Sequence, residues 1–246
     1  MRLAALLVFP LLMSACTVAT TQNTPSSQPA PQQDAPQTQR APQQLTEADA
    51  RRMARSFTSV VRRVEPVAER ECRARTSNLD CDFKIVVDDR PNQPANAYQT
   101  LDNTGRPILA MTVALIAQAS NTDELAFVLG HEAAHHISNH LGKQRQNATA
   151  GALVFGGLAQ ITGGGSSAIE SASRIGATVG ARSYSKDFEL EADALGAVIA
   201  HKAGYDPVLG AEFFNRIPDP GDRFLGTHPP NAERIRTVRR VAATLK

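Results

Sequence analysis

The sequence contains no tryptophan, and aromatic residues make up only 5% of its 246 residues. This scarcity argues against a platform on which sugars or other ligands stack. An excess of one charge is also missing, because the formal net charge is +2. No basic run carries interleaved aromatic residues, so we expect no nucleic-acid partner. Hydrophobic residues make up 42% of the chain, which is enough for one core and at most a small accessory element.

Cysteine is scarce as well, with three residues in the chain, and the first of them follows an export signal. Residues 3–12 are apolar, and the small residues Ser14 and Ala15 stand directly before Cys16. We interpret residues 1–15 as a signal peptide. Its end resembles the lipobox of bacterial lipoproteins, which implies cleavage before Cys16 and lipidation of that residue. The alternative is an ordinary signal peptide that leaves a soluble periplasmic protein.

Lipidation of Cys16 would leave Cys72 and Cys81 as a pair. Because an oxidising periplasm favours disulfides, we expect these two residues to close a small loop. A short loop gains less stability than a long one, so the bond would act as a local staple. Two free thiols are the alternative. A metal site is disfavoured because no second Cys or His pair lies near them in sequence.

A tether is predicted between the lipid anchor and the folded domain. Residues 16–44 are rich in Pro, Gln, Ser, Thr and Ala, and cannot bury enough apolar surface to fold. The folded domain is predicted over residues 45–246. It begins with a helix capped at Thr46, in which an apolar stripe extends to Val64. Pro66 is expected to end this helix or to begin a second one.

Three short strands are predicted at residues 82–87, 96–100 and 107–112, where β-branched and aromatic residues are bounded by turn residues. We expect them to form a small antiparallel sheet. Its edge would pair with an extended peptide, because main-chain hydrogen bonds hold any sequence in register. The alternative is that a loop covers this edge.

The most informative stretch of the chain is the H-E-x-x-H motif that runs from His131 to His135. Residues four apart share one face of a helix, so these two imidazoles can point at one metal ion. Neutral imidazoles suit Zn²⁺, and Glu132 beside them can take a proton from water that the metal acidifies. His136 and His140 fall off the ligand face, and we expect them to be polar or supporting residues rather than ligands.

A third ligand is predicted in the helix that contains Glu189 and Asp193, which are four residues apart on one face. Catalytic zinc usually has three protein ligands and one open position. One of the two carboxylates would bind the metal, and the other would receive the N–H of a ligating histidine. Glu191 is a rival ligand, but it points about 200° round the helix from Glu189.

Between the two motifs, residues 148–173 are rich in Gly, Ala and Ser, with Glu170 as their only charge. The glycines make a membrane span improbable. We predict helical pieces joined by a mobile loop that acts as a lid over the site. The alternative is a packed, Ala-rich helical hairpin with no gating role.

The H-E-x-x-H helix followed by E-x-x-A-D-x-x-G resembles the gluzincin zinc metallopeptidases of the HtpX, BepA and CAAX-prenyl endopeptidase group, in particular their soluble periplasmic branch. The resemblance extends from about Thr46 to the end of the chain. It implies an α+β, mostly helical zincin-like domain with a small antiparallel sheet beside the active-site helix. It further implies one Zn²⁺ per chain, a catalytic role for Glu132, and the following metal site: His131, His135 and Glu189 as ligands, with Asp193 as the supporting carboxylate.

The resemblance also draws attention to His228, in the stretch Thr-His-Pro-Pro. By analogy, His228 either steadies the oxyanion during catalysis or occupies the open zinc position in a resting state. A capping or surface histidine is the alternative.

The expected function is hydrolysis of misfolded or misassembled envelope proteins by an endopeptidase. Unfolded or extended polypeptides would be its substrates, and outer-membrane assembly machinery a further partner. The residue directly after the lipidated cysteine is Thr17, as in lipoproteins that it resembles and that are sent to the periplasmic side of the outer membrane. The competing hypothesis is a latent or weakly active module that uses the zincin fold to hold envelope proteins as a chaperone.

Overall fold

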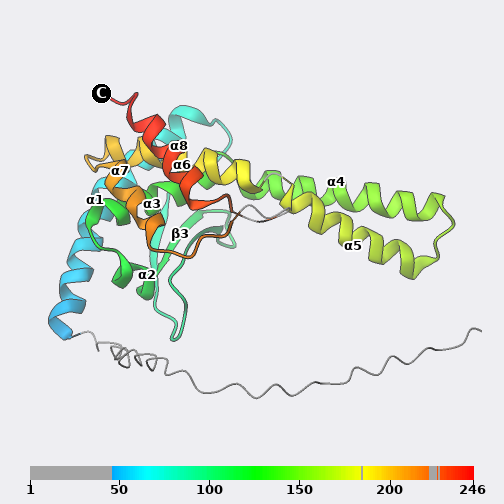
Figure 1. Ribbon diagram of the computed structural model, residues 1–246, viewed down its shortest axis with the longest axis horizontal. Helices are drawn as coiled ribbons and strands as arrows, with labels where there is room; N and C mark the ends of the chain where they lie inside the picture. The colour runs from blue at the N-terminus through cyan, green and yellow to red at the C-terminus, as the bar shows by residue number, and fades with distance from the viewer. Residues whose placement is uncertain (1–45, 184, 222–225, 227) are drawn as a thin grey trace, which may run out of the picture. The chain divides into compact units, whose positions relative to one another are not determined.

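The computed structural model describes residues 46–183, 185–221, 226 and 228–246 of the chain. The predicted signal peptide (1–15), the predicted lipidation site Cys16 and the rest of the predicted tether (16–44) lie outside the described residues. Helices predominate among the described residues, and three short strands form one sheet (Figure 1). The expectation of an α+β, mostly helical fold is therefore confirmed.

The first helix, α1 (Glu47–Arg75), is longer than predicted because Pro66 lies inside it without ending it. Thr46 caps the helix in a capping box with Asp49. A proline inside a helix costs about 3 kcal/mol, since it removes one hydrogen bond and crowds the preceding turn. Burial of one apolar face on both sides of the proline offsets this cost; that face contains Phe57, Val60, Val64, Val67, Ala68 and Cys72.

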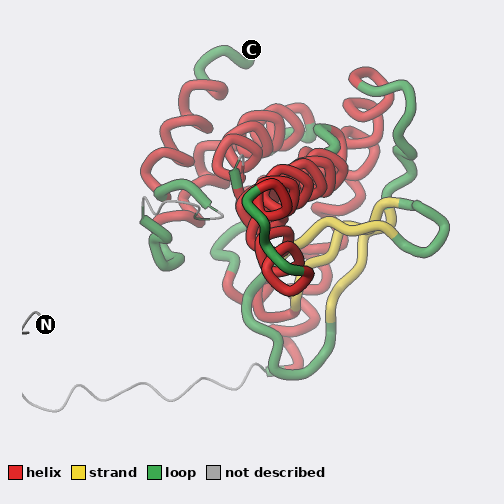
Figure 2. The backbone as a smooth tube through the Cα atoms, turned by 90° about the vertical axis from the view of Figure 1, so that its right-hand side faces the viewer, coloured by secondary structure: helices red, strands yellow, loops and turns green. Residues whose placement is uncertain are grey.

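The sheet contains β1 (Lys84–Asp88), β2 (Ala97–Leu101) and β3 (Pro107–Thr112), in the spatial order β1-β3-β2. The prediction that all strands are antiparallel is wrong in one respect. A tight turn closed by Asp102 and Gly105 returns β3 beside β2 in an antiparallel pair, with Ala97 opposite Met111. Since β2 runs opposite to β1, this second reversal leaves β3 parallel to β1, with which it pairs. Figure 2 shows the three strands beside the helices.

Helix α3 (Thr122–Ile137) carries the H-E-x-x-H motif and is the most enclosed helix near the sheet, with 12 of its 16 residues buried. A short helix, α2 (Val113–Gln118), leads into it from β3. Asn121 caps α3 by accepting a hydrogen bond from the N–H of Glu124. Helix α1, helix α6 and the sheet all pack against α3. The motif is therefore held rigidly within the core.

Helix α6 (Ser185–Lys202) crosses α3 at an unusually close point. A Cβ atom on Gly130 would lie 2.9 Å from the backbone oxygen of Gly196, and one on Gly196 would lie 2.8 Å from the backbone nitrogen of His131. Only glycine permits this approach of the two backbones. After α6 come α7 (Pro207–Ala211), a 3-10 helix (η1, Glu212–Asn215) and α8 (Asn231–Ala242).

The Gly- and Ala-rich segment forms two long helices, α4 (His140–Ile161) and α5 (Ser166–Arg182), which pack against each other as a hairpin. Figure 1 shows the hairpin extending away from the other helices. This arrangement corresponds to the packed hairpin that the sequence left as an alternative. Among the described residues, no helix has both the length and the apolar character needed to cross a membrane.

We expect the substitution Gly196→Ala to lower the free energy of unfolding by about 1–3 kcal/mol, because its Cβ would overlap the α3 backbone. Gly157→Ala is the matched control, since a Cβ added there in α4 meets no atom within 4 Å. That control should be neutral or stabilising by up to about 1 kcal/mol, from helix propensity. Urea unfolding followed by circular dichroism measures both. Equal effects of the two substitutions would show that the close crossing is not required.

Candidate active site

Helices α3 and α6 present three potential metal ligands to one point. Nε2 of His131 lies 3.0 Å from Nε2 of His135. The carboxylate of Glu189 faces both rings, at 3.3 Å from Nε2 of His135 and 3.6 Å from Nε2 of His131. One donor atom from each of the three residues lies within 4.8 Å of the others. The structure thus brings together the three residues that the sequence indicated as ligands.

The residues present fit a divalent cation. Two imidazoles and a carboxylate form a donor set typical of catalytic zinc. Among the described residues, none donates a hydrogen bond of good geometry to the buried Oε2 of Glu189. Such an atom is costly to bury unless it has a partner, and a metal ion is one.

Asp193 and Arg234 support His131. Nδ1 of His131 donates to Oδ1 of Asp193 at 3.0 Å, so Nε2 is left pointing toward Glu189. Arg234 donates two hydrogen bonds to the same carboxylate, at 2.8 and 2.7 Å, and all three side chains are buried. Burial disfavours charge on His131, but the neighbouring carboxylates of Asp193 and Glu189 prevail and raise its pKa to about 10.

A second chain of hydrogen bonds supports His135. Its Nδ1 lies 2.9 Å from Nδ1 of His140, and Nε2 of His140 lies 3.1 Å from Glu191. If Nε2 of His135 binds a cation, its Nδ1 carries the proton and donates to His140, which then donates to Glu191. Burial lowers the pKa of His140 to about 4, which keeps this ring neutral as the chain requires. Glu191, the rival ligand, therefore contacts His140 and is not part of the ligand group.

His140 reaches His135 because the chain bends sharply between α3 and α4. Asn139 adopts a left-handed conformation, with φ 52° and ψ 40°, which asparagine tolerates better than most residues. His140 then begins α4, and its ring stacks on Phe188 of α6 with 4.5 Å between the ring centroids. This bend explains how a residue five positions after His135 becomes its neighbour.

Comparison with known proteins agrees with this geometry. Residues 54–242 match Peptidase family M48, which is more than half of the chain. The chain belongs to peptidase family M48. It is also similar to the "Putative beta-barrel assembly-enhancing protease" of Vibrio cholerae serotype O1, with 33% identity over 130 residues. That match covers 50% of this chain but only 26% of the relative's length.

The M48 site opens into a cleft of about 630 Å³, which the ligand residues line together with Glu132 and His228. Glu132 is buried, and burial raises the pKa of its carboxyl group. A raised pKa suits a group that accepts and returns a proton near neutral pH. His228 is half-exposed, and its Nδ1 lies 3.0 Å from Oε2 of Glu189. His228 therefore lies against the ligand group rather than on a remote surface.

One wall of the cleft is the edge strand β2, through residues 95–99. Backbone bonds to β3 are formed at Asn96, whose carbonyl accepts from Thr112, and at Asp102, which donates to Arg106. Antiparallel pairing alternates along a strand, so the N–H and C=O groups of Ala97 and Gln99 point away from β3. Among the described residues, no backbone group pairs with this outward side of β2, so the cleft is bordered by a free strand edge.

Sequence reasoning missed Arg234, which contacts Asp193 and also approaches Oε2 of Glu189 at 3.3 Å. A signal was present, because Arg234 falls on the same helical face as the buried residues Asn231, Ile235 and Val238. A charged residue on the inner face of an amphipathic helix indicates a buried partner. Because the helix contains several other arginines, Arg234 was not recognised as different from them in the sequence.

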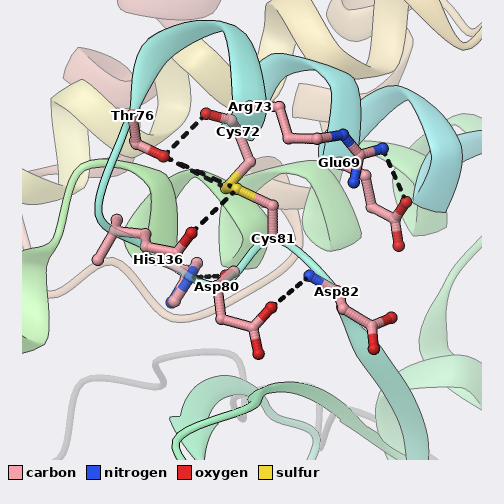
Figure 3. The surroundings of a disulfide bond; sticks show 9 residues. Glu69, Cys72, Arg73, Thr76, Asp80, Cys81, Asp82 and His136 are labelled. Carbon is pink, nitrogen blue, oxygen red and sulfur yellow. Dashed lines mark hydrogen bonds and ion pairs between the residues drawn. A yellow bond between two sulfur atoms is a disulfide. The ribbon is translucent and has the colours of Figure 1, made fainter.

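The disulfide between Cys72 and Cys81 lies close to the end of the motif helix. It joins α1 to the loop that contains Asp80, and Nε2 of His136 donates to the carbonyl oxygen of Asp80 at 2.7 Å (Figure 3). His136 also packs edge-on against Phe83. His136 is therefore a structural residue that connects α3 to the loop closed by the disulfide.

We expect His140→Phe to lower the affinity for Zn²⁺ by about 10–100-fold, because His135 loses the acceptor that fixes its tautomer. Phenylalanine preserves the ring that stacks on Phe188. Competition with a chromogenic chelator measures the dissociation constant. His201→Phe, at the far end of α6, is the control and should bind Zn²⁺ as the parent protein does. An unchanged affinity of His140→Phe would contradict the supporting role.

Proposed function

We propose that this chain is a zinc-dependent endopeptidase that hydrolyses misfolded or misassembled cell-envelope proteins. The observation that carries the proposal is the convergence of His131, His135 and Glu189, with Glu132 beside them in the same cleft. Zinc, when bound by the first three residues, supplies a Lewis acid and lowers the pKa of water.

The chain's own residues supply positioning and proton transfer. Glu132 accepts a proton from the attacking water at a carboxylate oxygen and delivers it to the nitrogen of the leaving amine. Asp193 and Arg234 hold the His131 ring, and His140 holds the His135 ring, so neither imidazole turns during the reaction. Burial of Glu132 keeps bulk water from competing for the transferred proton.

An extended segment of polypeptide is the proposed substrate. It would add to the free edge of β2, where Ala97 and Gln99 offer backbone donors and acceptors beside the cleft. Main-chain pairing recognises extended conformation rather than side chains. This mode suits a protease that acts on unfolded chains of varied sequence.

The proposed cellular setting is the periplasmic side of the outer membrane, with a lipid anchor at Cys16. The Vibrio cholerae relative is described as a putative beta-barrel assembly-enhancing protease, which supports outer-membrane assembly machinery as a partner. The end of the signal segment at Ser14, Ala15 and Cys16 supports the anchor. A soluble periplasmic protein is the alternative location. A Cys16→Ser variant that stays in the membrane fraction would count against the lipid anchor.

A latent protein that holds clients is the second candidate function. The contact of His228 with Oε2 of Glu189 favours it, because an imidazole at that place competes with substrate for the site. In this state His228 would block the cleft until a client or partner displaces it. The opposite role, in which His228 steadies the oxyanion, requires the same residue for cleavage.

We expect Glu132→Gln to abolish casein hydrolysis, with a loss of about 10²–10⁴-fold, because an amide cannot accept the proton. The purified protein should contain close to one equivalent of zinc in both the parent and the variant, since Glu132 is not a ligand. A chelator should stop the parent enzyme, and added zinc should restore it.

Equal cleavage by Glu132→Gln and the parent would contradict the assigned role of Glu132. Zinc bound without cleavage in the parent would support the latent state, and cleavage that appears only in His228→Ala would identify the block. Absence of zinc would refute the ligand assignment to His131, His135 and Glu189.

We expect Gln99→Pro to raise KM for an unfolded substrate by about tenfold, because it removes one backbone donor from the free edge of β2. Proline is tolerated on the outward side of an edge strand, so the sheet should survive. Gln99→Ala keeps the N–H group and is the matched control. A similar KM for both variants would show that substrates do not pair with this edge. Circular dichroism verifies that each variant is folded.

A further inference from the structure

The exposed apolar side chains of the described residues are concentrated on the α4–α5 hairpin. Ten large hydrophobic residues are exposed, and six of them lie on these two helices: Leu153, Val154, Phe155, Leu158, Ile161 and Ile175. Ile161, at the end of α4, is 85% exposed, and Leu153 is 71% exposed. A protein rarely leaves so much apolar surface in contact with water without a partner for it.

The charges of the hairpin are as unevenly distributed as its apolar residues. No Asp, Glu, Lys or Arg occurs in residues 146–169, which include the outer part of α4, the connecting turn and the start of α5. Lys143 and Arg145 on α4 and Arg182 on α5 stand near the base, and Arg174 stands partway along α5, close to where Gly176 meets Phe155. Glu170 is the only acid in the hairpin, and it pairs with Arg174.

The connecting turn satisfies much of its own backbone. The N–H groups of Thr162 and Gly164 donate to the carbonyls of Leu158 and Ala159, and the Thr162 hydroxyl donates to Leu158 as well. Gly163 adopts φ +81°, which lets the chain turn at this point. Helix carbonyls that already accept hydrogen bonds in this way cost little free energy to transfer out of water. The tip of the hairpin is therefore suited to an apolar medium.

We propose that the tip of the α4–α5 hairpin inserts into the surface of a lipid bilayer, with an anionic leaflet as the partner. The apolar residues Leu158 and Ile161 would enter the acyl region, and the basic residues farther from the tip would meet the headgroups. Entry is from one side only, because the two antiparallel helices return the chain to where it started.

The charge pattern distinguishes a bilayer from a protein partner. A protein interface normally has an apolar centre and a polar, charged rim, since only one face of the element is covered. The hairpin tip, residues 157–169, lacks charge on both helices. An element surrounded by hydrocarbon needs that property, whereas an element covered on one face by a second copy or a client does not.

Depth-dependent fluorescence quenching tests the insertion on the full chain. Ile161→Cys is labelled with an environment-sensitive fluorophore, and Leu209→Cys on α7, where the parent side chain is 50% exposed, is the matched control. Both proteins are mixed with vesicles of phosphatidylcholine and phosphatidylglycerol that contain brominated acyl chains. The label at Ile161 should shift to the blue and be quenched, and the label at Leu209 should show neither change.

Absence of quenching at Ile161 would overturn the proposal, whether or not the protein sediments with the vesicles. A blue shift without vesicles, or only with an added unfolded protein, would overturn it in favour of a second copy or a client. In the labelled chain, Leu158→Ser should reduce quenching about tenfold, because an apolar contact at the tip is lost. Casein hydrolysis should be unchanged in that variant, so the result is independent of the proposed function.

Discussion

The close crossing of α3 and α6 is the constraint on which the site depends. Because Gly130 and Gly196 have no Cβ, the two backbones approach at the residue next to His131. The crossing sets Glu189 of α6 against the two histidines of α3, and one donor atom from each of the three ligands lies within 4.8 Å of the others. The packing that builds the core and the geometry that binds a metal are therefore one interaction, and a change at either glycine would affect both.

The electrostatics of the site follow from this packing. Among the described residues of the site, three carboxylates are buried, on Glu132, Glu189 and Asp193, against one buried guanidinium, that of Arg234. With neutral imidazoles, these groups leave a net charge of about two negative units in a medium that disfavours unpaired charge. A divalent cation balances this charge. Without one, the same excess is what raises the pKa of His131 to about 10, because the ring gains most by holding a proton between two carboxylates.

Much of this site could be predicted from the sequence, because its parts are local. The spacing from His131 to His135, and from Glu189 to Asp193, fixes each pair on one face of its own helix. Contacts that depend on tertiary packing were not predicted. The partner of Asp193 on α8 was missed, and the parallel pairing of β1 with β3 was not expected, because neither leaves a mark within a short window. Pro66 was misjudged for the same reason: burial on both sides of it decides whether the helix continues.

The α4–α5 hairpin, which lies between the two motifs in the sequence, contacts the site at its base and extends away from it toward its tip. At their base, α4 and α6 contribute His140 and Phe188, whose rings stack and line the cleft. At its far end, the hairpin carries its apolar residues into solvent. If the tip rests in a bilayer, the rigid packing of α4 against α5 sets the direction in which the cleft faces relative to that surface. A lipid anchor alone would restrain distance but not orientation, whereas a second contact through the hairpin restrains both. The same helix that holds His135 in its binding tautomer would then also determine which polypeptides at the membrane surface reach the edge of β2.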